Sequence, residues 1–202
     1  FKTAFMHYST DRDRAASAAR RAAERSIELD PMDPFANFSM GRSLWLVGDL
    51  SGALGWLNRS TSISPNFAQG IYARAWTEMV SGSSIEGRRL SDKARALSPL
   101  DPMLYAMLAT RAISISMDGN DEEAAKWAER AANEPGAHDL IWVIAVVMNE
   151  LAGKVDLAKR WVGRLKQRRG DISQDLFFRS FPFSDHATRA RYSAALNRHN
   201  IK

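Results

Sequence analysis

The chain has 202 residues, of which 45% are apolar and 25% charged, the composition of an ordinary protein with a sizeable core. Its net charge is +5, and because the basic residues are scattered, the sequence lacks the concentrated basic face typical of nucleic-acid-binding domains. There is no cysteine, which excludes disulfides and thiolate chemistry, and we expect a reducing, cytoplasmic location.

The first predicted elements are a helical stub at 1–8 and a complete helix at 14–29 that ends before Pro31. The chain begins at Phe1, with neither an initiator methionine nor a signal sequence, and we expect it to be a piece of a longer protein. The longest apolar run, 140–148, is far shorter than the ~20 residues needed to cross a bilayer. That run therefore predicts a buried helix.

Prolines and glycines recur at a single period along the chain. Pro31, Pro65 and Pro99 are each 34 residues apart, and Gly48 and Gly82 have the same separation. Each proline follows the apolar end of a helix that it cannot extend, and each glycine lies between two helical segments. This spacing predicts an array of helix-turn-helix units.

The second unit, 34–65, is regular enough to assign the faces of its two helices. Small residues, Gly41 and Ala53, lie where the antiparallel helices should cross, because a large side chain there would force them apart. The other residues expected on the facing sides of this helix pair are Asn37, Met40, Leu44, Leu57 and Ser60.

The third unit has two possible registers. Strict counting puts Arg74 and Glu78 at core positions, which requires that they pair at i,i+4, and moves Tyr72 and Trp76 into the groove. A helix that slips by one residue instead buries Tyr72, Ala75, Trp76 and Met79. We favour the slip, because burying an unpaired charge costs more than shifting a loop.

The remaining units lead to a different C-terminal segment. The fourth unit has about two residues inserted near its turn at Gly119, and its predicted core residues are Tyr105, Leu108, Ala109 and Ala112. The fifth unit turns at Gly153. After Gly170, a short apolar helix and an amphipathic helix with Ser184 as its N-cap predict a cap for the stack. In all, the sequence predicts about twelve helices and no strand.

The second unit resembles the tetratricopeptide repeat, a 34-residue helix-turn-helix with the order W-x2-L-G-x2-Y…A-x3-F…P. The resemblance covers 1–170, with a truncated first repeat. It implies an all-α fold, a right-handed superhelix of about five repeats followed by capping helices at 171–202. The stretches "DPFANFSMGRSLWLVGD", "LSPLDPMLYAMLATRA" and "AAKWAERAANEPGAH" are also similar to the C-terminal repeats of bacterial winged-helix transcription factors and class III nucleotide cyclases.

In this family the first helices line a concave groove that binds a protein or peptide. The family pattern implies that twelve residues face this groove: Phe35, Phe38, Arg42 and Trp45 in the second unit, Met103, Ala106, Thr110 and Ile113 in the fourth, and Leu140, Val143, Val147 and Glu150 in the fifth. Such a groove would be apolar and aromatic, and its Arg42 would pair with a carboxylate of the ligand. The alternative is that these aromatic side chains pack against neighbouring repeats.

No catalytic or metal-binding pattern is present in the sequence. The four histidines are far apart, and the glycines at 82 and 87 lack the Lys-Ser/Thr pair of a phosphate loop. The acidic run 118–123 is expected to begin a helix and not to bind calcium. We therefore expect no enzyme activity, no cofactor, and no nucleic-acid or membrane contact.

The resemblance implies the regulatory C-terminal part of a bacterial transcriptional regulator. Two alternatives stay open. One is the regulatory region of an adenylate or guanylate cyclase. The other is a self-association module that forms a homodimer.

Overall fold

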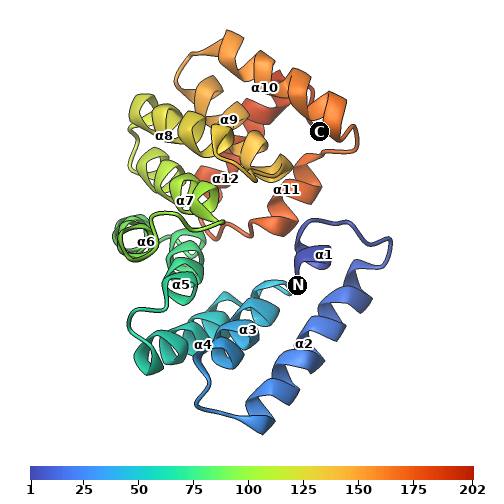
Figure 1. Ribbon diagram of the computed structural model, residues 1–202. Coiled ribbons are helices and arrows are strands. Elements are labelled where there is room, and N and C mark those ends of the chain that lie inside the picture. The colour runs from blue at the N-terminus through green and yellow to red at the C-terminus, as the bar shows by residue number, and fades with distance from the viewer.

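The computed structural model describes residues 1–202 and contains twelve helices and no strand, as the sequence predicts (Figure 1). The helices are α1 (Lys2–Phe5), α2 (Arg12–Leu29), α3 (Pro34–Trp45), α4 (Leu50–Ile63), α5 (Ala68–Val80), α6 (Ser84–Leu97), α7 (Leu104–Met117), α8 (Asp121–Asn133), α9 (Asp139–Leu151), α10 (Val155–Arg168), α11 (Gln174–Ser180) and α12 (His186–Arg198). From α3 to α10 they form antiparallel pairs stacked into a curved array. None of these helices is long and apolar enough to cross a membrane.

The turn inside each pair is built in the same way. Gly48, Gly82, Gly119 and Gly153 all adopt a left-handed backbone, with φ between 70° and 101°, which favours glycine. The side chain of Asp49 then caps α4 by accepting a hydrogen bond from the Gly52 N–H at 2.8 Å. The periodic glycines of the sequence are therefore the points at which each first helix ends and the chain reverses.

The third unit keeps the strict 34-residue register, so the predicted slip is wrong, although Ala75, Trp76 and Met79 are buried as the slip predicted. Helices α3 and α5 begin 34 residues apart, and Ala75 lies against Gly87 as Gly41 lies against Ala53. The charges are accommodated because Arg74 pairs with Glu78 at 3.7 Å and with Glu86 at 3.4 Å at the edge of the core. The cost of burial that favoured the slip is thus avoided by partial exposure and pairing.

The insertion in the fourth unit lies before α7 and not near the turn. The loop at 98–103 between α6 and α7 is two residues longer than the equivalent loop at 64–67 between α4 and α5. As a result, Ala112 takes the place seven residues before the turn glycine that Gly41 and Ala75 occupy in their units. The predicted core residues Leu108, Ala109 and Ala112 are all buried, and Tyr105 is half-buried.

The last two helices lie along the inner side of the array, next to α9 and α7 (Figure 1). The sequence predicts that 171–202 covers the end of the stack, and α12 does pack on α9 of the last repeat. The segment also reaches earlier repeats: Arg191 donates to the Ser116 carbonyl at 3.0 Å, and the Ser184 N–H donates to the Val80 carbonyl at 2.8 Å. The N-cap of α12 is Asp185, not the predicted Ser184, because Asp185 accepts from the Thr188 N–H.

A single large core therefore joins the array to its C-terminal segment. It contains buried residues of α5 and of α7 through α12, together with Met6 beside α1. The carboxylate of Glu150 on α9 binds Arg198 at 2.9 Å and His199 at 2.8 Å at the end of α12. Burial works against the charge of Glu150, but these two hydrogen bonds outweigh it and lower the pKa of the carboxyl.

Candidate functional site

Most of the predicted groove residues of the fourth and fifth units are buried, which corrects the expectation of an open groove along the whole array. The five residues Ala106, Thr110, Ile113, Val143 and Val147 are at most 2% exposed. Leu140 and Glu150 are also buried, and Met103 is half-buried. The physical reason is that α11 and α12 pack on this side of the array, in one core with Ile113, Val143 and Val147.

Three of the four predicted groove residues on α3 line a hollow on the surface, and the fourth, Trp45, lines a central cavity instead. This α2–α3 groove has a volume of about 330 Å³ and places Phe35, Phe38 and Arg42 of α3 opposite small residues of α2, namely Ala19, Ala22, Ala23 and Ser26. Phe35 is 57% exposed, whereas Phe38 is almost fully buried against Phe67 of the next repeat. The structure thus keeps one open groove at the N-terminal repeat.

Arg42 has a cationic side chain without an acidic partner. Its guanidinium lies 3.5 Å above the ring of Phe1 and 5.0 Å from that of Phe38, and it forms no salt bridge. Burial lowers the pKa of Arg42 to about 10, so the group is still charged at neutral pH. A desolvated guanidinium of this kind is suited to bind a carboxylate, which would satisfy both its charge and its N–H donors.

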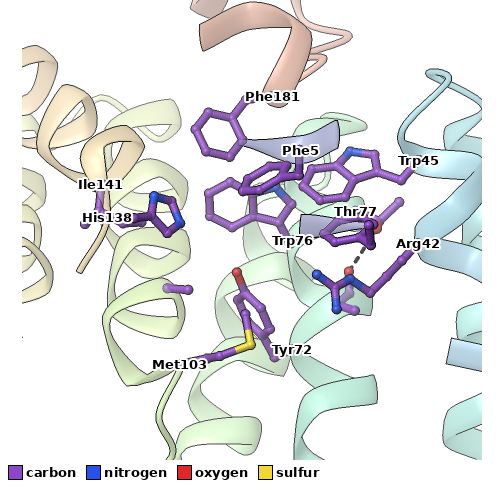
Figure 2. Close-up of a pocket in the computed structure, with 13 residues that line it drawn as sticks. Phe5, Arg42, Trp45, Tyr72, Trp76, Thr77, Met103, His138, Ile141 and Phe181 are labelled. Atoms are coloured by element: carbon purple, nitrogen blue, oxygen red, sulfur yellow. Dashed lines mark hydrogen bonds between the residues drawn. The ribbon is translucent and has the colours of Figure 1, made fainter. Parts of the chain in front are cut away.

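Beyond Arg42 the groove leads to a small central cavity of about 40 Å³, walled mostly by aromatic rings (Figure 2). The rings of Trp45 and Trp76 are 6.3 Å apart, and Trp76 lies 4.8 Å from Phe181. A cavity of this size has room for water molecules but not for a peptide side chain. Three buried polar atoms on its walls have no hydrogen-bond partner: Trp45 Nε1, Trp76 Nε1 and His138 Nδ1.

The segment around α1 lies between α3 on one side and the helices α9 and α11 on the other. Figure 2 shows Phe5 between Trp45 and Phe181, at centroid distances of 5.4 Å and 5.6 Å. Phe1 stacks on Phe5 at 5.6 Å and on Trp45 at 6.0 Å. The first and last parts of the chain therefore meet at this cavity.

His138 makes the stability of this region dependent on pH. Its ring packs edge-on against Phe5 and Tyr105, and burial, aided by the positive charges of Lys2 and Arg168, lowers its pKa from 6.5 to about 4. Between these values the unfolded chain binds the proton and the folded chain does not. The free energy of unfolding is therefore expected to decrease as the pH falls from 6.5 to about 4.

This pH dependence can be measured by urea denaturation of three variants of the chain. The decrease should be smaller in His138→Gln than in the wild type. The matched control is His186→Gln, since His186 is exposed, and it should keep the wild-type dependence. Equal slopes in the wild type and His138→Gln would contradict this assignment.

No group of three or more acidic or histidine residues is arranged to hold a metal ion. The glycines that mimic a phosphate loop have structural roles: Gly82 forms the turn, and Gly87 lies against Met79 and Ala75. The acidic run begins α8, and Asn120 accepts from the Glu123 N–H as the N-cap. The features that could suggest chemistry in the sequence are thus accounted for by helix turns, crossings and caps.

Comparison with known proteins supports this fold. No family model and no curated protein matches the chain. Among solved structures, it is similar to PilW, a type IV pilus biogenesis factor, with a TM-score of 0.69 at 18% identity over 97% of this chain and 90% of that one. It is also similar to TTC0263, a thermophilic TPR protein of Thermus thermophilus, with a TM-score of 0.69 at 16% identity over 97% and 96% of the two chains. The chain has the tetratricopeptide-repeat fold.

A third similar structure is YrrB, described as a TPR protein with an unusual peptide-binding site, with a TM-score of 0.56 at 14% identity over 90% of this chain and 92% of that one. At these identities the likeness concerns the fold alone. In tetratricopeptide-repeat terms, α3, α5, α7 and α9 are the first helices of their repeats and line the concave side. The α2–α3 groove and the central cavity both lie on that side.

Several of the residues that line the central cavity were not assigned to it from the sequence. The slipped register places Tyr72 and Trp76 in the core, although the strict count of 34 residues places them in the groove, and they line the cavity. Phe5, His138 and Phe181 have no local signal, because they meet the concave side through contacts between the two ends of the chain. The strict count is thus the one signal that could have found part of this site.

Proposed function

We propose that the chain is a non-catalytic binding domain that receives an apolar protein segment carrying a carboxylate in the α2–α3 groove. The observation that carries this proposal is the combination of exposed Phe35 with Arg42, a desolvated cation without an acidic partner, along one groove. The alanine floor of α2 lets a partner helix approach closely. Phe35 provides apolar contact, and Arg42 pairs with an acidic side chain of the ligand.

Two sources of support favour a binding role over catalysis. The fold is shared with YrrB, whose description includes a peptide-binding site, and with PilW, described as a pilus biogenesis factor. The sequence stretches that resemble bacterial regulators suggest a place for the module as the regulatory C-terminal part of a transcription factor, or else of a nucleotide cyclase. A winged helix or a metal-binding aspartate pair encoded before Phe1 would distinguish these two settings.

Peptide selection on the full chain tests this proposal. Peptides selected from a displayed library should bind Phe35→Ser and Arg42→Gln variants at least about tenfold more weakly than the wild type. The matched control is Ile85→Ser, because Ile85 is 70% exposed on α6 and lies outside the groove. Replacing the acidic residue of a selected peptide by its amide should cause about the same loss as Arg42→Gln.

Peptides that bind both groove variants as tightly as they bind the wild type would place the binding surface elsewhere and overturn the proposal. Circular dichroism of each variant shows whether its helices are intact.

Self-association is a second candidate, favoured by three exposed apolar residues near the same groove. Leu29, Met32 and Phe35 are 69%, 60% and 57% exposed, although side chains of this kind are usually covered. Light scattering over a range of concentrations would detect a dimer. A dimer that dissociates in Phe35→Ser would favour this candidate over a free groove.

A further inference from the structure

We propose that α1 is an internal ligand of the concave side, and that the partner is a helical segment with the same chemistry, which takes its place. That chemistry is two aromatic side chains one helical turn apart, followed by a long apolar residue, as in Phe1, Phe5 and Met6. This inference rests on the proposed function, because it names the partner of the groove that contains Arg42. It also assigns a role to the central cavity.

The two rings of α1 bind as recognition side chains do in a helix–groove complex. Phe1 and Phe5 are four residues apart, so both project from one face of the short helix. Phe1 lies beneath the Arg42 guanidinium, at the end of the α2–α3 groove. Phe5 reaches Trp45, His138 and Phe181, which belong to three different parts of the array.

The backbone of α1 is bound at its C-terminal end by the far end of the chain. Arg169 donates to the Met6 carbonyl at 2.7 Å and to the His7 carbonyl at 3.4 Å, and Ser180 donates to the Phe5 carbonyl at 2.9 Å. These carbonyls are the acceptors that a helix leaves unpaired at its C-terminus. Any helical segment offers the same acceptors, so this part of the recognition does not depend on its sequence.

Three hollows meet at the side chains that α1 contacts. The α2–α3 groove, the central cavity and a third hollow of about 350 Å³ beside Pro102 and Tyr105 are all lined by Phe1 and Arg42. The three hollows therefore adjoin one another at these two side chains. The unpaired indole N–H groups of Trp45 and Trp76 on the walls of the central cavity are donors for a ligand longer than α1.

The structure of α1 makes its exchange feasible. The residue that follows Met6 is His7, with φ of 53°, a conformation that L-residues other than glycine adopt at a cost. A segment that binds the same surface without such a residue avoids this cost.

The test uses a synthetic peptide of residues 1–8, FKTAFMHY, acetylated at its N-terminus so that no ammonium group faces Arg42. Its affinity for the full chain is measured by fluorescence anisotropy in three variants. Phe5→Ala and Phe1→Ala each remove one aromatic ring of the internal ligand and leave the surface that binds the peptide unchanged. Ile85→Ala is the control, because Ile85 is 70% exposed on α6 and lines none of the three hollows.

We expect the peptide to bind Phe5→Ala at least about tenfold more tightly than the wild type or Ile85→Ala, since less of the groove is occupied. Phe1→Ala should give an increase of the same sign, and it keeps the test informative if Phe5→Ala loses helical content. A peptide with both phenylalanines changed to alanine should not bind any variant. Equal affinity in all variants, or equal binding of the alanine peptide, would overturn the inference.

The two proposals fail in distinguishable ways. If selected peptides bind in the α2–α3 groove but Phe5→Ala does not raise their affinity, the proposed function stands and α1 is not a ligand. If selected peptides ignore Phe35 and Arg42, the proposed function fails first, whatever the affinity of the peptide of residues 1–8.

Discussion

Removal of residues 171–202 is expected to abolish cooperative folding of the whole chain. Four large side chains of this segment, Phe177, Phe181, Tyr192 and Leu196, are at most 1% exposed. Each contributes about 1.5–3 kcal/mol by leaving water, so together they rival the ~5–15 kcal/mol of net stability of a typical domain. Their loss would also expose apolar residues of α7 and α9 in the same core, and the truncated chain should aggregate.

Size-exclusion chromatography and thermal denaturation followed by circular dichroism measure this effect. A milder version is Phe181→Ala, which should lower the free energy of unfolding by about 3–5 kcal/mol in urea denaturation. The same substitution at Phe35, which is 57% exposed, is the matched control and should change it by less than about 1 kcal/mol. A truncated chain that is monomeric and melts cooperatively would show that the array is stable without its last helices.

The second large effect is expected at the helix crossings, where a methyl group has no room. A Cβ atom on Gly41 would lie 2.7 Å from Leu57 Cγ and 2.9 Å from the Ala53 carbonyl oxygen, and the latter belongs to the backbone. Gly41→Ala therefore forces α3 and α4 apart and should lower the free energy of unfolding by about 1–3 kcal/mol. The melting temperature should fall by about 2–4 °C for each kcal/mol.

The chain has its own control for this substitution. Gly55 lies in the interior of α4, and a Cβ atom added there would have no neighbour within 4 Å, so Gly55→Ala should raise stability by about 0.5–1 kcal/mol. Gly87→Ala should behave like Gly41→Ala, because its Cβ would lie 2.7 Å from Met79 Cβ and 3.0 Å from the Ala75 carbonyl oxygen. Changes of the same sign at Gly41 and Gly55 would contradict the role of the crossing.

Much of the architecture could be predicted because its determinants are local. A proline ends a helix, a glycine permits the left-handed turn, and small residues mark a crossing, each by stereochemistry that acts within a few residues. Repetition at 34 residues then extends one well-marked unit, 34–65, to its neighbours. The predicted register of the third repeat is wrong because it follows a general rule about burial and not this count, although Arg74 and Glu78 pair at the edge of the core.

Local sequence patterns were enough to predict the helices, their turns, the period of the array and the place of Phe35, Phe38 and Arg42 along one groove. How much of the concave side stays open depends instead on contacts between distant parts of the chain. The contacts that close it join residues 163 and 175 positions apart, Arg169 with Met6 and Ser180 with Phe5. No local pattern encodes such pairs, because they depend on how far the stacked repeats curve before the two ends of the chain meet.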